Sequence, residues 1–134
     1  MNIAIVAHDN KKELATQFCT AYKGILEKHD LFATGTTGKI LRETTGLSVC
    51  CFLPGSQGGN QQISARIAYN QIDLVLFFCD PQVFENYENE VMVLIRQCDL
   101  MNVPMATNLA TAEIMVRALD RGDLDWRDIV NPKE

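Results

Sequence analysis

The stretch Leu74-Val75-Leu76-Phe77-Phe78 places five apolar residues in succession and is followed by Cys79-Asp80-Pro81. A strand with one exposed face alternates apolar and polar side chains, whereas a parallel strand that is covered on both faces is apolar throughout. The stretch therefore predicts a buried parallel strand that ends just before Asp80. Because parallel neighbours are joined by crossover connections, we expect helices before and after this strand.

Short apolar runs alternate with segments of helical spacing along the whole chain. The predicted strands are residues 3–7, 31–33, 47–53, 73–78 and 103–106, and the predicted helices are residues 12–28, 39–43, 61–69, 88–101 and 111–121. Five β-α units in succession predict an α/β domain of three layers. In this Rossmann-like arrangement, an open five-stranded parallel sheet has helices on both faces.

Size and charge narrow the class of protein. The chain has 134 residues, of which 47% are apolar, and its net charge is −5. We expect a single globular domain over residues 1–134. The 12 lysines and arginines form no basic run, which disfavours a nucleic acid or an anionic membrane as partner. A small anionic substrate is compatible with the negative net charge, because local loops rather than the net charge would hold it.

The five cysteines are odd in number and form no CxxC motif, which favours reduced thiols over a disulfide framework. The apolar run at residues 3–7 is too short for a signal peptide, and no segment has the length of a membrane helix. We therefore expect a cytoplasmic protein. The chain has only two histidines, without HxxxH or Cys-His spacing, so a metal site is not predicted.

Polar residues follow each of the five predicted strands. Open α/β sheets bind their ligands beyond the carboxyl ends of the strands, so these residues are expected to share one polar rim. They are His8 and Asp9, residues 34–38, residues 55–60, Asp80 and Pro81, and Thr107 and Asn108.

The segment Ala33-Thr34-Gly35-Thr36-Thr37-Gly38 combines three hydroxyls with two glycines between a strand and a helix. Backbone N–H groups and hydroxyls at a helix N-terminus form a good cradle for an anion. A glycine turn with a threonine cap needs fewer such groups, so a phosphate or carboxylate site is favoured. The chain has neither a Walker A lysine at the required place nor a GxGxxG pattern.

Two further strand ends carry charged residues with alternative roles. His8 could polarise a carbonyl, Asp9 could orient a neighbour and Lys12 could contact a phosphate. Alternatively, Asp9 or Asn10 caps a helix and Lys12 is a solvated charge. Asp80 either caps the following turn or belongs to a carboxylate network that tunes the pKa of a neighbour.

The chain resembles the methylglyoxal synthase family over nearly its whole length. The resemblance rests on segments at the predicted strand ends: Val6-Ala7-His8-Asp9, residues 31–38, Gly58-Gly59 followed by Gln61-Gln62, Asp80-Pro81, and residues 103–108. It implies a lyase, without metal or organic cofactor, that converts dihydroxyacetone phosphate to methylglyoxal and phosphate, usually as a homohexamer. In that family a carboxylate removes a proton beside the ketone, and the enediolate that results expels phosphate.

The resemblance also assigns roles to residues of the rim. It implies that His8 and Lys12 bind the substrate and that Asp9 and Asp80 belong to a supporting set of carboxylates. The phosphate would be held by residues of two loops, which are Thr34, Gly35, Thr36, Thr37 and Gly55, with Gly58 and Gly59 shaping the second loop.

Four positions depart from the family pattern. Asn60 stands where the family has its catalytic aspartate, and Pro54 replaces a serine, which removes a hydroxyl and an N–H from the cradle. Tyr87 replaces a histidine that contacts the substrate, and Glu90 replaces an aspartate. An amide nitrogen has no available lone pair, so Asn60 cannot act as a general base at neutral pH. Loss of a positioned base costs about 10²–10⁴-fold in rate.

Three functions are therefore compared. The first is a methylglyoxal synthase-like lyase that is impaired in its base, in which Asp9, Asp80 or Glu90 could replace the base. The second is a catalytically inactive or re-purposed module that binds a phosphorylated ligand, similar to the allosteric domain of carbamoyl phosphate synthetase. The third is a lyase or isomerase for another small anion, with a pocket reshaped by Tyr87 and Pro54.

Overall fold

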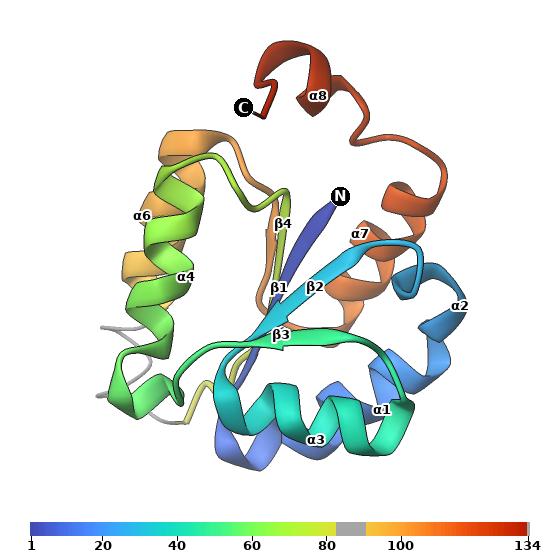
Figure 1. Cartoon of the computed structure of the whole chain (residues 1–134), viewed down its shortest axis with the longest axis vertical. Coiled ribbons are helices and arrows are strands. Elements are labelled where there is room, and N and C mark those ends of the chain that lie inside the picture. Colours follow the sequence, from blue (N-terminus) through green and yellow to red (C-terminus); the bar gives the residue numbers. More distant parts are fainter. Residues whose placement is uncertain (83–90, 134) are drawn as a thin grey trace.

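A computed structural model describes residues 1–82 and 91–133 of the chain. Five parallel strands form one sheet in the order β3-β2-β1-β4-β5 (Figure 1). The strands are β1 (Asn2–Ala7), β2 (Asp30–Ala33), β3 (Val49–Cys51), β4 (Leu74–Phe78) and β5 (Met105–Ala106). The α-helices are α1 (Lys12–Ala21), α2 (Lys23–Leu26), α3 (Gly35–Thr45), α4 (Gly59–Ala68), α6 (Met92–Met101), α7 (Leu109–Asp120) and α8 (Trp126–Val130). The short 3-10 helices η1 (Asp9–Lys11) and η2 (Gly55–Gln57) follow β1 and β3.

Strand β4 is buried on both of its faces, as its unbroken apolar sequence predicts. It lies between β1 and β5, and Leu76 pairs with Ile5 in β1 and with Ala106 in β5. The side chains of Leu74, Leu76 and Phe78 enter one hydrophobic cluster, and those of Val75 and Phe77 enter the other. The predicted three-layer α/β fold with a five-stranded parallel sheet is confirmed.

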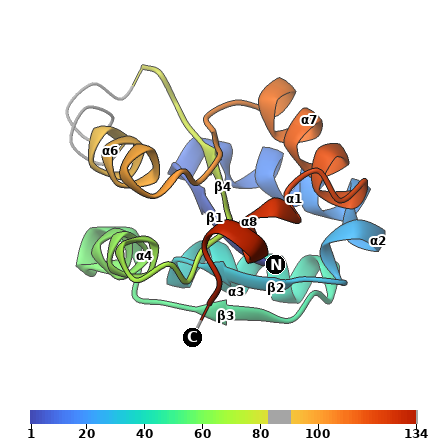
Figure 2. The same ribbon diagram turned by 90° about the horizontal axis from the view of Figure 1, so that it is seen from above.

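The helices divide between the two faces of the sheet. Helices α1, α3 and α7 pack on one face, whereas α4 and α6 pack on the other (Figures 1 and 2). Phe18 of α1 and Val116 of α7 contribute to the first cluster, and Ile63 of α4 and Leu94 of α6 contribute to the second. Burial on both faces explains why apolar runs, rather than alternating patterns, mark the strands.

Helices α3 and α4 begin earlier than the sequence predicts. We expect starts at residues 39 and 61, but the helices begin at Gly35 and Gly59, so the glycines form their first turns. Glycine is a poor helix former, and its low propensity suggested a loop. Close packing explains the glycines instead. A Cβ on Gly38 would lie 2.5 Å from Cys51 Sγ, and a Cβ on Gly59 would lie 2.0 Å from the Leu53 carbonyl oxygen.

Three other predicted elements also change. The predicted helix over residues 12–28 is divided at Tyr22 into α1 and α2, and the predicted strand over residues 47–53 is reduced to β3. Leu47 is buried before the strand, in a turn where its N–H donates to Thr45 Oγ1 (3.1 Å). The predicted helix over residues 88–101 is observed as α6 from Met92, and residues 88–90 lie outside the described part of the chain.

The apolar residues Leu124, Trp126 and Ile129 predict hydrophobic anchors for the C-terminal segment, but of these only Leu124 packs against the core, and the fully buried residue is charged. Trp126 is 42% exposed and Ile129 is 82% exposed, whereas Arg127 is fully buried. Figure 1 shows α8 at the same end of the sheet as the N-terminus, where β1 begins. Hydrophobicity alone could not identify the buried arginine, because its burial depends on a partner that is distant in sequence.

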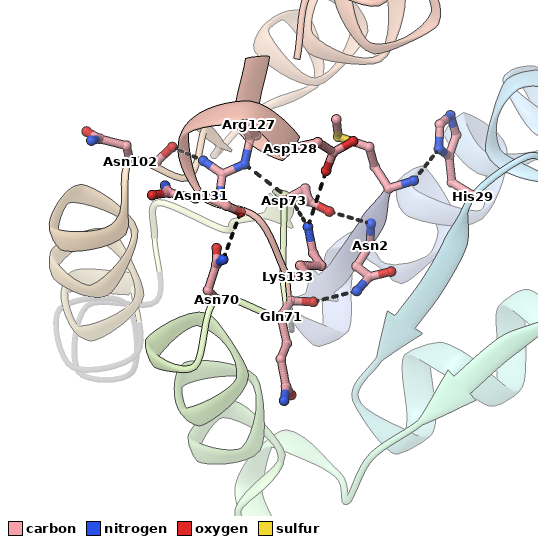
Figure 3. Close-up of polar contacts among 11 residues, drawn as sticks. Asn2, His29, Asn70, Gln71, Asp73, Asn102, Arg127, Asp128, Asn131 and Lys133 are labelled. Carbon is pink, nitrogen blue, oxygen red and sulfur yellow. Dashed lines mark hydrogen bonds and ion pairs between the residues drawn. The ribbon is translucent and has the colours of Figure 1, made fainter. Parts of the chain in front are cut away.

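That partner is Asp73, a fully buried residue just before β4 (Figure 3). Its carboxylate accepts hydrogen bonds from the Asn2 backbone N–H (2.8 Å), Arg127 Nε (3.3 Å) and Lys133 Nζ (2.5 Å). Arg127 also donates to the Asn102 carbonyl oxygen. Burial raises the pKa of Asp73, but the hydrogen bonds from Asn2 and Lys133 and the two cations outweigh it and lower the pKa overall. The resulting stabilisation is present above the usual Asp pKa of 3.8 and is lost as the pH falls below it.

Substitution of Arg127 tests this anchor. We expect Arg127→Met to lower the free energy of unfolding by about 3–5 kcal/mol, because it leaves the Asp73 carboxylate buried beside one partner fewer. Arg121→Met is the matched control, since its ion pair with Asp123 is exposed and contributes less than about 1 kcal/mol. Urea unfolding of both variants measures the difference. Equal, small losses would contradict the anchoring role.

Candidate functional site

The candidate site lies at the carboxyl ends of the strands, where the winding of the sheet reverses. From β1 the chain adds β2 and then β3 on one side, and it later adds β4 and β5 on the other. The ends of β1 and β4 therefore border a topological switch point, which is where open α/β sheets form their ligand crevice. His8 follows β1, and Asp80 lies two residues beyond β4.

His8 is fixed against the end of β4. Its backbone N–H donates to the Phe78 carbonyl oxygen (3.1 Å), and its ring lies edge-on to Phe77 with the centroids 5.1 Å apart. The Asp80 backbone N–H donates to His8 Nδ1 (2.7 Å). Because Nδ1 accepts this hydrogen bond, the proton of the neutral imidazole is assigned to Nε2. His8 can therefore donate a hydrogen bond while it is uncharged.

The carboxylate of Asp80 is held by two donors. Asn10 Nδ2 donates to Oδ2 (2.5 Å), and the Gln82 backbone N–H donates to Oδ1 (3.0 Å). These bonds, that of Gln82 first, lower the pKa of Asp80, and the charge of Lys11 adds a smaller contribution in the same direction. Asp80 thus closes the turn to Gln82, which is the first of the two predicted roles, and its other partner is the amide of Asn10 rather than a second carboxylate. No signal in the sequence indicates the partnership with Asn10, which is 70 residues away.

Lys12 is turned back toward β1, whereas Asp9 faces solvent. Lys12 Nζ donates to the Ala7 carbonyl oxygen (2.9 Å) and lies 3.3 Å from Asp9 Oδ1. The Lys12 side chain is largely buried, so it is not simply a solvated charge. The Asp9 side chain is fully exposed, and neither Asp9 nor Asn10 caps a helix here, because His8 occupies the N-cap position of η1.

The N-termini of α3 and α4 meet at the connection that follows β3. The Gly35 N–H donates to the Leu53 carbonyl oxygen (3.1 Å), and the Gly59 N–H donates to the Pro54 carbonyl oxygen (3.0 Å). A Cβ on Gly59 would also lie 3.0 Å from Thr34 Cγ2. The fold therefore brings the two predicted loops into direct contact and directs two positive helix ends to the same place.

The first turn of α3 has hydrogen-bonding capacity that the described residues do not use. Its N-cap residue, Thr34, makes no side-chain capping bond, although N-cap threonines commonly do so. Thr37 Oγ1 is buried without a hydrogen-bond partner among the described residues. Thr36, in contrast, is exposed. Buried polar groups are normally paired, so the orphaned Thr37 hydroxyl indicates a position where a ligand oxygen can be bound.

Asn60 lies in the first turn of α4, against Gly55. A Cβ on Gly55 would lie 3.4 Å from Asn60 Nδ2 and 3.6 Å from Oδ1, so the glycine leaves room for the carboxamide. Asn60 Oδ1 is buried and has no hydrogen-bond partner among the described residues. The loop itself is fixed by Pro54, which caps η2, and by Gln62, whose Oε1 accepts from the Leu53 N–H (2.8 Å).

Gly58 allows the tight turn between η2 and α4. Its φ of 107° lies in the left-handed region, where a side chain is strained. Tyr87 and Glu90, the remaining predicted site residues, lie outside the described residues.

Within residues 1–82 and 91–133, no group of three or more His, Cys, Asp or Glu side chains is arranged to hold a metal ion. No helix in the same part of the chain is both long enough and apolar enough to cross a membrane.

This geometry defines the class of protein as an open α/β domain with polar groups gathered at the carboxyl ends of its strands. Two helix N-termini and a buried hydroxyl suit an anionic group, and the imidazole that follows β1 suits a carbonyl oxygen. A family model described as "MGS-like domain" matches residues 15–107.

Named relatives agree with this match. Methylglyoxal synthase of Caldicellulosiruptor saccharolyticus is 61% identical over 99% of this chain and 94% of its own length, and that of Alkaliphilus metalliredigens is 53% identical over 99% of each. The crystal structure of methylglyoxal synthase from Elizabethkingia anophelis NUHP1 is 43% identical and has a TM-score of 0.81, over 86% of this chain and 76% of that one. The chain belongs to the methylglyoxal synthase family.

The contact at Gly59 can be tested directly. We expect Gly59→Ala to destabilise the fold by about 2–3 kcal/mol and to weaken binding of inorganic phosphate, because the added methyl group overlaps the Leu53 carbonyl group. Gly24→Ala is the control, since a Cβ there meets nothing within 4 Å. Thermal unfolding and calorimetric titration with phosphate measure both effects. Unchanged phosphate affinity in a folded Gly59→Ala variant would argue against a cradle at this junction.

Proposed function

We propose that this chain eliminates phosphate from dihydroxyacetone phosphate to give methylglyoxal, through an enediolate, and that Asn60 makes the reaction slow. The observation that carries the proposal is the meeting of the α3 and α4 N-termini beside the unpaired Thr37 hydroxyl. A phosphate ester is the anion that such a junction suits best, because several of its oxygens can accept hydrogen bonds at once. The family membership supports the same substrate class.

The phosphate would be bound by residues of the two joined loops. The donors at the start of α3 would be the hydroxyls of Thr34, Thr36 and Thr37 together with backbone N–H groups of that turn. Gly35, whose own N–H is bound to the Leu53 carbonyl oxygen, and Gly55 of η2 would line the cradle. Release of phosphate from the enediolate leaves negative charge on the departing oxygen. The positive ends of two helices stabilise that charge as it develops.

His8 would contact the carbonyl oxygen of the substrate through Nε2. A neutral donor stabilises the enediolate oxygen without first being deprotonated, and the Asp80 N–H keeps the imidazole in the required tautomer. Lys12, held beside the Ala7 carbonyl group, adds positive charge near the end of β1. We propose that Lys12 orients the substrate rather than exchanging a proton.

The proton-abstracting step lacks its usual group. Asn60 is an amide, and the two carboxylates that follow β1 and β4 are poor replacements. Asp9 points to solvent, and both oxygens of Asp80 accept hydrogen bonds that lower its pKa and hence its basicity. Glu90 is the remaining acid of the predicted set and lies outside the described residues.

The alternative function is binding of a phosphorylated ligand without turnover. Asn60 specifically favours it, because its carboxamide, of which Oδ1 is buried, has the size of the family's aspartate and lies against Gly55 but supplies no base. Under this alternative the same cradle binds phosphate, but the bound ligand leaves unchanged.

We also propose that the chain acts in the cytoplasm as a homohexamer, as the family resemblance implies. Exposed apolar side chains on α6, α7 and the end of α4, among them Leu100, Ile114 and Tyr69, support association with further copies. Sedimentation equilibrium is expected to give six times the mass of one chain. A monomer at micromolar concentration would contradict this assembly.

The decisive variant is Asn60→Asp. We expect it to raise kcat for phosphate release from dihydroxyacetone phosphate by about 10²–10⁴-fold, because it restores a carboxylate at the position of the base. Gln61→Glu is the matched control, since it adds the same charge one residue further along α4 and should not raise kcat. A coupled phosphate-release assay on the three proteins measures the effect.

The possible results separate the two functions. Slow turnover by the native chain and a large gain in Asn60→Asp support an impaired lyase. Turnover only after the substitution supports the binding module with an otherwise intact site. No turnover by either protein, in the presence of measured phosphate binding, would refute the lyase proposal.

A further inference from the structure

We propose that Arg42 and Cys51 form a modification site at which an α-oxoaldehyde of the methylglyoxal type crosslinks α3 to β3. This inference rests on the proposed function only for the source of the aldehyde. The chemistry depends on the two side chains, which lie on the outer side of the sheet edge formed by β3.

The two side chains are in contact across a surface pocket. Arg42 Nη1 lies 3.6 Å from Cys51 Sγ and donates a hydrogen bond to it. The pocket is lined by both residues together with Gly35, Lys39 and Glu43. Cys51 is only partly buried and Arg42 is exposed, so a small molecule can reach both from solvent.

The contact is built into the fold rather than being a chance approach of two flexible chains. Cys51 ends β3 and its sulfur lies over Gly38, where a Cβ would come within 2.5 Å of it. Arg42 follows Gly38 by one helical turn and so projects from the same face of α3. The sulfur is therefore held in place by the glycine, and the guanidinium reaches it from the next turn.

A three-carbon α-oxoaldehyde has electrophilic carbons that match this pair. The guanidine nitrogens bond to both carbonyl carbons, and the sulfur bonds to the carbon of the former methyl group, which gives an imidazole bridge. The two carbonyl oxygens leave as two waters. Of the four hydrogens that these waters need, two come from the guanidine, one from the methyl group and one from the thiol. The step needs no oxidant or reductant. Two nucleophiles held in contact react as an intramolecular pair, which raises their effective concentration.

The other cysteines lack this combination of exposure and partner. Cys50 is exposed, but it precedes Cys51 on β3 and so points to the opposite face. Cys19, Cys79 and Cys98 are buried, and burial raises the pKa of Cys19 and Cys98 to about 12, which keeps these thiols protonated and unreactive. Cys50 is therefore the matched control for a thiol without a guanidinium.

The position of the pair links the modification to the candidate site. Gly35 lines the same pocket and also begins α3, where its N–H is bound to the Leu53 carbonyl oxygen. A product that leaves the phosphate cradle on this side would meet the pair at once. The crosslink would tie the helix that carries the cradle to the strand beside it.

The test treats the purified full chain with methylglyoxal itself as the probe. Intact-mass and peptide mass spectrometry are expected to show a gain equal to one methylglyoxal minus two waters, in a peptide pair that joins Arg42 to Cys51. In the native chain and in Cys50→Ser, this crosslink should form at least about tenfold faster than an adduct at any other thiol. Cys51→Ser and Arg42→Lys should not form it, and thermal unfolding of each variant confirms that it is folded.

Several results would overturn the inference. These are modification of Cys50 as fast as Cys51, the same adduct in Arg42→Lys, or no crosslink in the native chain after prolonged exposure. Because methylglyoxal is supplied directly, these results do not bear on the lyase reaction. A parallel incubation with dihydroxyacetone phosphate tests the lyase reaction. If methylglyoxal gives the crosslink and dihydroxyacetone phosphate does not, the result supports the reactive pair and counts against conversion of the phosphate ester by this chain.

Discussion

Burial of β4 on both faces is the constraint from which the rest of the architecture follows. A strand without a solvent-exposed face needs helices on each side, and parallel neighbours then require right-handed crossovers. All strands consequently end at one edge, and the chain winds outward from β1 in both directions. This topology brings together the polar residues that follow β1, β2, β3 and β4. His8 and its partner Asp80, for example, are 72 residues apart in the sequence.

The two edges of the sheet carry different kinds of polar chemistry. At the amino edge, the Asp73 carboxylate is paired with Arg127 and Lys133, which anchors α8, although Arg127 Nη2 and Asn70 Oδ1 are buried there without partners among the described residues (Figure 3). At the carboxyl edge, Thr37 Oγ1 and Asn60 Oδ1 are buried without partners among the described residues. Paired charges fix structure, whereas unpaired polar groups have capacity for a ligand. The candidate site is distinguished by the two helix N-termini that lie beside its unpaired groups, rather than by total charge.

The candidate site separates binding from proton transfer. In the proposed function, the cradle depends on backbone N–H groups and on close glycine contacts, which a change at Asn60 leaves intact. The proposed reaction needs a carboxylate as its base, and at that position the chain has an amide. Under this proposal the chain keeps the geometry for phosphate while the rate of the chemical step falls, so Asn60 affects the mechanism more than the fold.

The sequence by itself determined the class of fold, the five strands and the residues at their carboxyl ends, because apolar runs and glycines report burial and turns locally. The helix starts predicted from the sequence for α3 and α4 were too late. Gly35 and Gly59 are needed because a side chain there would meet the backbone of the segment after β3, and helix propensity carries no information about such contacts. Only the tertiary structure decided that Asn10 holds Asp80, that Arg127 is buried against Asp73 and that Arg42 meets Cys51. Each of these pairs depends on the relative placement of two elements, which spacing along the chain does not encode.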